Sequence, residues 1–256
     1  MLKSWVTLLG AAGLFAAFSA QAITADELIA KNAAARGGLD KIAAIKTLKL
    51  EGKMRFIGGF GSIDLTFAQY KQAPDSVRTE ASVQGLTQVQ SWDGKEAWQI
   101  SPFQGRRDPE RMSDDDAKSM ADDAPIAGSL IGYKERGDRI EYLGTEDVDG
   151  TNAYKLKVTF KNGDAEFVYL DPDHYVEIRT VGQRKVRGTL IEDINDYGDY
   201  ELVDGVYFPF SIDSKTRGDG GETVLTVEKA QANAPLDATL FAFPSAPKSA
   251  TPKSGQ

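Results

Sequence analysis

The sequence predicts a mainly β fold with a few helices, in which an incomplete antiparallel β-barrel of about eleven strands is covered by helices. Three observations predict it. Apolar and polar residues alternate from residue 47 almost to the C-terminus, turn dipeptides that contain glycine recur between the alternating segments, and helical spacing is confined to the beginning and one central segment. Alternation with a period of two is typical of strands with one buried face. Sequential hairpins of this kind form a meandering sheet or an open barrel.

Two helices are expected before the first strand. Thr24 followed by Glu27 is a capping-box pattern, which marks the beginning of a helix. Apolar residues then recur at helical spacing until Gly37 and Gly38, which are typical of a helix end. A second short helix is predicted over residues 39–45.

The strands follow from the alternation and from the turns between the alternating segments. In the first strand, Leu48, Leu50, Met54 and Phe56 share one face and charged residues occupy the other, so we expect one dry and one wet side. Glycine turns are expected at residues 58–61, 93–94, 149–150, 162–163 and 204–205. The predicted strand ranges are 47–56, 63–71, 76–84, 86–92, 95–101, 138–148, 153–160, 165–170, 175–182, 186–197, 206–216 and 222–230.

The segment 102–133 interrupts the strand pattern and predicts a helical insertion that lies over the sheet. Ser113 with Asp116 is a second capping pattern, and Ala124 with Pro125 restarts the chain before an apolar stretch at 126–131. One interpretation is an acidic solvated loop, because Asp-rich stretches usually face water. The functional interpretation is a lid over residues 104–132 that opens and closes.

A strongly curved sheet has a concave face that other elements must fill. If helices fill it completely, its apolar residues are ordinary core; if they fill it incompletely, an apolar cavity results that can bind lipid. The candidates for lining such a cavity are Met54, Phe56, Ile63, Leu65, Phe67, Trp92, Trp98, Phe103, Ile126 and Leu130.

The first 22 residues have the pattern of a secretory signal peptide. Lys3 precedes an uncharged apolar run, and residues 20–22 form a small-residue cleavage site, so cleavage is expected after Ala22. The apolar run is too short to span a bilayer as a helix. We therefore expect a periplasmic protein with a single domain over residues 23–244 and a disordered tail over 245–256, which is rich in Ser, Pro and Lys.

Composition argues against several functional classes. Without residues 1–22 the chain has 29 basic and 38 acidic residues, a net charge of −9, which excludes a nucleic-acid-binding role. The absence of cysteine excludes disulfides, thiolate metal sites and a lipid-modified cysteine. No nucleotide-binding, serine-hydrolase or zinc-protease motif occurs, and the single histidine, His174, lies in a sequence typical of an exposed turn. We expect no catalytic residue, no metal and no cofactor.

Three motifs in order resemble a known family. Residues 70–75 resemble a strand-end motif in which a basic residue precedes a proline turn. Residues 91–98, with the pair Pro102 and Phe103, are similar to a D-G-K-x-x-W hairpin followed by Pro-Phe. In residues 236–244 an acidic residue precedes Phe241, Phe243 and Pro244. Together these motifs resemble the periplasmic outer-membrane lipoprotein carriers, the LolA-like superfamily of lipid-binding half-barrels.

The resemblance implies a carrier that binds acyl chains of lipoproteins or lipids in an apolar cavity and moves them toward the outer membrane. It also implies membrane donor and acceptor proteins as partners, and we expect a monomer. The family's arginine directly before the proline, which is thought to hold the lid closed, is replaced by Ala73, with Lys71 and Arg78 as the nearest cations. Two alternatives stay open: an envelope lipid or stress sensor on the same fold, and an enzyme, which would need a convergent polar cluster in the pocket.

Overall fold

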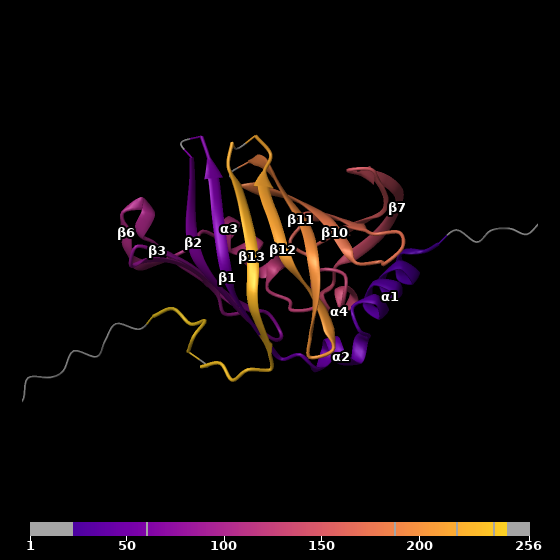
Figure 1. The fold of residues 1–256 in the computed structure, drawn as a ribbon, viewed down its shortest axis with the longest axis horizontal. Coiled ribbons are helices and arrows are strands. Elements are labelled where there is room, and N and C mark those ends of the chain that lie inside the picture. Colours follow the sequence, from indigo (N-terminus) through magenta and orange to yellow (C-terminus); the bar gives the residue numbers. More distant parts are fainter. Residues whose placement is uncertain (1–22, 60, 187, 219, 238, 245–256) are drawn as a thin grey trace, which may run out of the picture.

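The structure, a computed structural model, describes residues 23–244 apart from residues 60, 187, 219 and 238. The predicted signal peptide and the predicted tail lie outside the described residues. Within them, one antiparallel sheet of thirteen strands dominates the molecule (Figure 1). The strands are β1 (Thr47–Gly58), β2 (Gly61–Gln72), β3 (Ser76–Val83), β4 (Leu86–Trp92), β5 (Ala97–Ser101), β6 (Arg106–Arg111), β7 (Arg139–Val148), β8 (Thr151–Thr159), β9 (Ala165–Leu170), β10 (Glu177–Val186), β11 (Thr189–Val203), β12 (Val206–Thr216) and β13 (Glu222–Ala232).

The order of the strands determines where the rest of the chain must run. The sheet reads β6-β5-β4-β3-β2-β1-β13-β12-β11-β10-β9-β8-β7, so the first and last strands pair in its middle and β6 and β7 form its two edges. The sheet is open, as the sequence predicted. Because the chain leaves β6 at one edge and begins β7 at the other, the connection between them has to cross a face of the sheet.

That connection contains the cover predicted from the sequence, with one correction. A 3₁₀ turn (Pro102–Gln104) is followed by the strand β6, which pairs with β5, so residues 106–111 extend the sheet and are not helical as we expected. The helices are α3 (Asp114–Asp123) and α4 (Tyr133–Arg136). The Ser113 Oγ accepts from the backbone N–H of Asp116, which confirms the predicted cap.

Two further helices precede β1 and cover another part of the concave face. In α1 (Ala25–Ala35) the predicted capping box is present, since the Glu27 carboxylate accepts from the backbone N–H of Thr24 at 2.8 Å. Leu28 of α1 packs on a buried cluster of β8 and β9 residues with Leu130. The short helix α2 (Leu39–Ala44) places Ile42 in a second cluster with residues of β1, β2, β12 and β13. Figure 1 shows α3 and α4 behind the strands and α1 and α2 at the lower right end of the sheet.

Register confirms that the apolar stripe of β1 lies on the concave face. Opposite Leu50, Met54 and Phe56 on β1 stand Gln69, Leu65 and Ile63 on β2, with Phe67 opposite Gly52. Each of the strand ranges predicted from alternation corresponds to an observed strand. Leu65 and Phe67 are buried, whereas Phe56 and Ile63, nearer the β1–β2 turn, are 46% and 44% exposed. The face predicted to be buried is therefore buried only in the part of the hairpin that is far from the β1–β2 turn.

The segment after β13 packs against β4 and β5. The backbone carbonyl of Phe241 accepts from the Trp98 Nε1 at 2.8 Å and from the Ser91 hydroxyl at 2.9 Å, and all three residues are buried. The Trp98 and Phe243 rings meet edge to face at 6.2 Å. The hairpin motif and the C-terminal motif recognised in the sequence are thus two halves of one contact.

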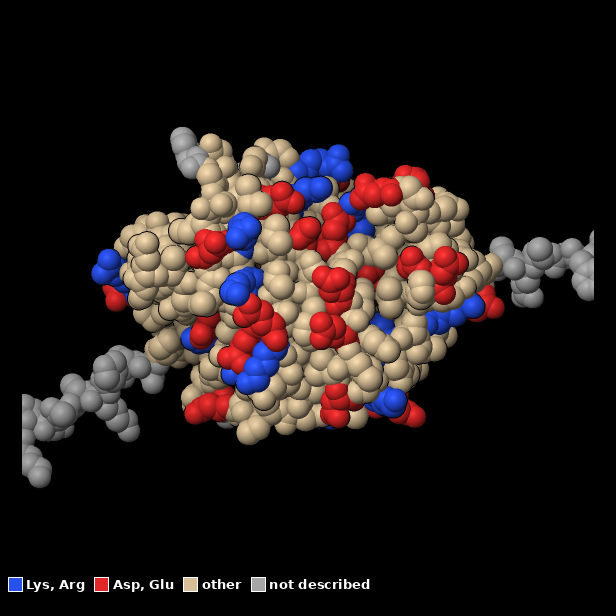
Figure 2. All heavy atoms as spheres, viewed as in Figure 1, with Lys and Arg blue, Asp and Glu red and all other residues tan. Residues whose placement is uncertain are grey.

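The opposite, convex face is charged and solvated. Figure 2 shows acidic side chains in a broken column over the middle strands, with basic side chains interspersed on one side. Ion pairs such as Lys53–Glu228 and Arg55–Asp64 are mostly exposed. Within the described part of the chain, no helix is long and apolar enough to cross a membrane.

Candidate functional site: a covered cavity on the concave face

A partly open cavity of about 510 Å³ lies between the concave face of the sheet and its cover. Its floor extends from Gln90 on β4 to Glu166 on β9, and its cover consists of α3 and residues 125–129. The volume is within the range of about 300–1,000 Å³ that is typical of small-ligand sites. The connection between β6 and β7, which has to cross the open sheet, therefore covers a space large enough for a ligand and does not pack directly on all the strands beneath it.

One part of the cavity is apolar. Its lining comes from the middle of the sheet and from the cover, and consists of Leu48, Leu50, Phe67, Ile126, Phe208, Ile212 and Leu225. Several of these side chains belong to the buried cluster that α2 closes from the side. This end of the cavity is continuous with the core of the protein, and its nearest polar side chains are Gln69 and Lys71, opposite Leu50 and Leu48.

The other part of the cavity is acidic. The pKa of Glu166 is raised to about 7, mainly by burial and also by the neighbouring carboxylates of Glu177, Asp123 and Asp122, against the lowering effect of a hydrogen bond from Ser129. Burial also raises the pKa of Asp122 to about 6, against the lowering effect of a hydrogen bond from Asn162. Near neutral pH these two carboxyl groups are therefore partly protonated.

A β-bulge directs Glu177 into the cavity. Thr180 and Arg179 pair with Val168 and Tyr169 in regular register, but the next residue of β9, Leu170, pairs with Glu177. The irregularity places Glu177 on the concave face, where regular alternation from Thr180 would place Ile178. Burial raises the pKa of Glu177, and the guanidinium of Arg36 lowers it.

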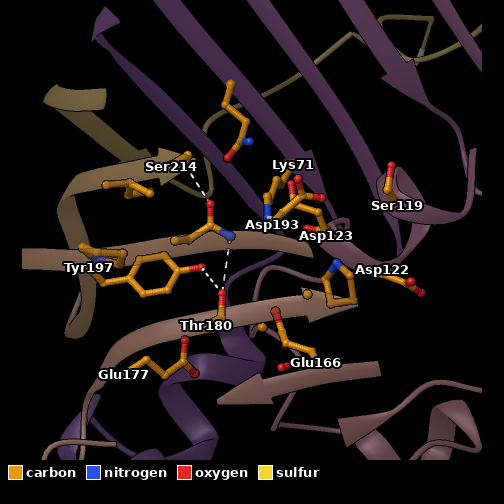
Figure 3. Close-up of a pocket in the computed structure, with 18 of the residues that line it drawn as sticks. Lys71, Ser119, Asp122, Asp123, Glu166, Glu177, Thr180, Asp193, Tyr197 and Ser214 are labelled. Atoms are coloured by element: carbon orange, nitrogen blue, oxygen red, sulfur yellow. Dashed lines mark hydrogen bonds and ion pairs between the residues drawn. The ribbon is translucent and has the colours of Figure 1, made fainter. Parts of the chain in front are cut away.

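A chain of hydrogen bonds runs across β10, β11 and β12 on the cavity floor. The hydroxyls of Thr180 and Tyr197 lie 3.2 Å apart, Asn195 Nδ2 donates to Thr180 Oγ1 at 3.4 Å, and the Ser214 hydroxyl donates to Asn195 Oδ1 at 2.7 Å. Figure 3 shows these side chains with Glu177 and Glu166 beside them. Burial raises the pKa of Tyr197 well above its usual value, so its hydroxyl stays protonated.

Two polar contacts hold the end of the cover helix to opposite sides of the cavity. The ammonium of Lys71 on β2 donates to the backbone carbonyl of Asp123 and lies 3.2 Å from its carboxylate. On the other side, Asn162 Nδ2 donates to both carboxylate oxygens of Asp122, at 3.0 and 3.1 Å. Helix α3 itself has no buried residue. These contacts therefore help to fix its position.

The cations near the altered proline motif have separate tasks. Ala73 stands where the carrier family has its arginine, and Lys71, two residues earlier, reaches the cover helix. Arg78 instead donates to the backbone carbonyl of Leu240 at 3.0 Å and pairs with Glu80. Lys71 therefore holds the cover, and Arg78 holds the C-terminal segment.

The ten candidate lining residues are placed in four different surroundings. Phe67 and Ile126 line the cavity, and Leu65 and Met54 continue the stripe of Phe67 on the concave face. Phe56 and Ile63 line a shallow hollow between the glycine-rich tips of the β1–β2 and β12–β13 hairpins. Trp98 is under the C-terminal segment and Leu130 in the α1 cluster, so neither is among the cavity-lining residues. Trp92 is half-buried outside the lining, and Phe103 is exposed.

His174 lies in an exposed turn, as the sequence predicted. Its ring Nδ1 is 3.1 Å from the Asp171 carboxylate, and its side chain is 80% exposed. It is not among the residues that line the cavity.

The acidic residues of the cavity were not among the sequence candidates. Glu166 alternates in phase with Val168 and Leu170, so a carboxylate on the apolar face of a strand was the signal that could have revealed it. Glu177 offered no such signal, because the bulge that turns it inward is visible only in the paired sheet.

Comparison with known proteins gives a result at the level of the fold. No protein-family model and no curated protein matches the chain. Among solved structures, a LolA superfamily protein from Nitrosomonas europaea matches with a TM-score of 0.61 and 14% identity, over 86% of this chain and 98% of that one. The chain has a LolA-like fold.

Two further structures share the LolA-like fold. A DUF1329 family protein from Desulfovibrio piger has a TM-score of 0.60 and 13% identity over 85% of this chain and 96% of that one. An outer membrane lipoprotein-sorting protein domain from Vibrio parahaemolyticus has a TM-score of 0.58 and 14% identity, over 84% and 95% of the two chains. The LolA-like fold thus extends over almost all of the described chain.

Proposed function

We propose that this protein is a periplasmic carrier that takes acyl chains of a lipid or lipoprotein into the concave cavity and moves them toward the outer membrane. The observation that carries the proposal is the apolar stripe of the β1–β2 hairpin, which runs in register from exposed Ile63 through Leu65 to Phe67 in the covered cavity. An acyl chain can enter along this stripe without leaving apolar surface. The donor and acceptor partners are proteins of the two membranes.

The free energy of transferring an acyl chain into water explains why such cargo requires a covered cavity. Each methylene group transferred from water contributes about 0.8 kcal/mol, so a chain of a dozen or more methylenes requires on the order of 10 kcal/mol of shielding. A carrier must also release its cargo, which requires a second conformation of comparable free energy. The cover helix α3 has no buried residue and is held by Lys71 and Asn162, so a movement of α3 alone leaves the core cluster around Leu130 intact.

The fold comparison supports the same proposal. One structure with this fold is described as an outer membrane lipoprotein-sorting domain. The predicted signal peptide agrees with export, and none of the sequence motifs indicates a catalytic reaction. Within the predicted lid, residues 104–132, we propose that α3 is the part that moves, because β6 pairs with β5 and Leu130 belongs to a core cluster.

The test is to identify what the protein carries. The mature protein is purified from an envelope extract and weighed by native mass spectrometry, then weighed again under denaturing conditions, and the released molecule is identified. A bound phospholipid or acylated protein is expected. A protein that arrives empty and also takes up no fluorescent fatty acid would overturn the carrier proposal and favour a partner-binding module.

A further inference from the structure

The cavity is divided by chemistry into an apolar half and an acidic half. Its lining includes six carboxylate residues, Asp122, Asp123, Asp164, Glu166, Glu177 and Asp193, but only three cationic residues, Arg36, Lys71 and Arg184. A site for a purely apolar chain needs none of these charges, because burying them without a partner costs free energy. The acidic half therefore needs its own explanation.

Each of the three cationic side chains already contacts another group of the protein. Lys71 is bound to Asp123 on the cover helix, and Arg184 pairs with Asp193 at 2.7 Å. Arg36 donates to the backbone carbonyl of Ala127 at 2.7 Å and is 4.0 Å from Glu177, beyond hydrogen-bond distance. Among the described residues, Glu166 and Asp122 form no ion pair: their hydrogen bonds come from Ser129 and Asn162, and the charge of Arg136 acts on Asp122 only from a distance.

One oxygen in this group has no hydrogen-bond partner within the described chain and only the distant ion pair with Arg36. The Oε1 atom of Glu177 is fully buried and accepts no hydrogen bond, although the bulge in β10 turns it into the cavity. Gly128 of the cover lies next to this oxygen, since a Cβ placed there would be 3.8 Å from it, and Glu177 itself is among the cavity-lining residues. A buried acceptor that faces a ligand-sized space indicates a donor supplied by the ligand.

We infer that the ligand of this cavity is an amphiphile with a cationic headgroup, of the primary amine class, which sits beside Glu166 and Glu177 while its chain lies along Phe67, Leu50 and Leu225. The inference rests on the proposed function, because it names the class of molecule that the same cavity carries. An ammonium group supplies both the positive charge that the acidic half lacks and the donor that Glu177 lacks. An anionic headgroup would face these carboxylates and Asp122 instead.

The test compares three probes with the same chain, dodecylamine, dodecanol and dodecanoate, titrated calorimetrically into the mature protein at pH 7.5. The amine is expected to bind about tenfold more tightly than the alcohol, the effect of one or two charge-assisted hydrogen bonds, and the carboxylate more weakly than both. In Glu166→Gln and Glu177→Gln the preference for the amine is expected to fall toward the alcohol's affinity. Glu228→Gln, which removes an exposed carboxylate outside the cavity, is the matched control and should keep it.

A second measurement uses the unaltered protein. The groups that act on Glu166 are Glu177 on β10, Asp122 and Asp123 on α3 and Ser129 in the cover, so an ammonium placed there favours its ionised form. Binding of dodecylamine near pH 6.5 should then release protons, measured as a dependence of the binding enthalpy on the buffer. Dodecanol should release none.

The outcomes separate the two proposals. Equal affinity for amine and alcohol, without proton release, overturns the inference and leaves the carrier function standing. Unchanged preference in both glutamine variants overturns the assignment to Glu166 and Glu177. If none of the three probes binds, the proposed function itself fails.

Discussion

Lys71 on β2 is bound to Asp123 at the end of the cover helix, with 3.2 Å between the ammonium nitrogen and a carboxylate oxygen and a further hydrogen bond to the backbone carbonyl. The carbonyl groups at a helix C-terminus carry partial negative charge, and α3 has no basic residue in its last turn. Lys71 supplies that missing charge from a neighbouring strand. Both residues line the cavity, so the contact joins a strand of its floor to its cover and links the helix position to the ligand space.

Replacing Lys71 should loosen the cover. In Lys71→Met we expect amide hydrogen exchange across residues 114–131 to become about fivefold faster, which corresponds to about 1 kcal/mol for a partly exposed ion pair with a hydrogen bond. Lys71→Arg keeps a cation at this position and is the control. Equal protection of these amides in the wild-type and Met proteins would show that the contact does not hold the lid.

A charge on the apolar stripe should abolish cargo binding. Leu65 is buried on the concave face, and Thr66 beside it is exposed on the other face. We expect Leu65→Glu to lose uptake of a fluorescent fatty acid because a carboxylate would lie along the entry path, while Thr66→Glu keeps it. Circular dichroism checks that both variants are folded. Undiminished uptake in a folded Leu65→Glu protein contradicts the proposed path.

Filling the cavity at Gly182 offers a test that adds no charge. Gly182 stands opposite Glu166 on β9, and a Cβ there would meet only the Asp193 carbonyl, at 3.8 Å. We expect Gly182→Leu to reduce probe binding at least tenfold because the side chain occupies ligand space, with little change in the melting temperature. Gly198→Leu, at a glycine of β11 that is not among the lining residues, is the control. Normal binding by Gly182→Leu would place the ligand elsewhere.

The raised pKa of Glu166 predicts how stability depends on pH. Its pKa is about 7 in the folded protein and near 4.5 in the unfolded chain, so the folded state binds more protons between these values. The stabilisation is fully present below about pH 4.5 and is lost as the pH rises through 7. We expect the free energy of unfolding of the empty protein to fall by up to about 3 kcal/mol from this group. Denaturant titrations should show a smaller dependence on pH in Glu166→Gln, and equal slopes would contradict the assignment.

Trp98 should matter for stability but not for binding. Trp98→Phe keeps an aromatic ring at this position but removes the hydrogen bond to the Phe241 carbonyl and part of the buried indole, so we expect a loss of about 1–3 kcal/mol. Urea unfolding measures the loss, and fatty-acid uptake should be unchanged because Trp98 is not among the cavity-lining residues. Impaired uptake in a stable Trp98→Phe protein would indicate that Trp98 does take part in ligand binding.

The residue pattern alone determined the strands, the caps and the apolar face. Alternation around Leu48 and Leu50 depends only on the two-residue period of a strand, and the caps at Thr24 and Ser113 depend on contacts three residues apart. Such local rules act within a few residues and can therefore be read from the sequence. These local rules did not predict the edge strand β6, because its mostly charged residues do not alternate clearly with apolar ones. It is a strand because it pairs with β5.

Only the tertiary structure decided which residues meet in the cavity. The pairing of β1 with β13 sends the chain from one sheet edge to the other and so places α3 over the concave face. The bulge at Glu177 depends on the register between the neighbouring strands β9 and β10. The contact between Lys71 and Asp123 joins residues about fifty positions apart in the sequence. Such contacts form only once the strand order and pairing of the whole sheet are established. Strand order is a property of the complete fold and cannot be derived from a local segment of the sequence.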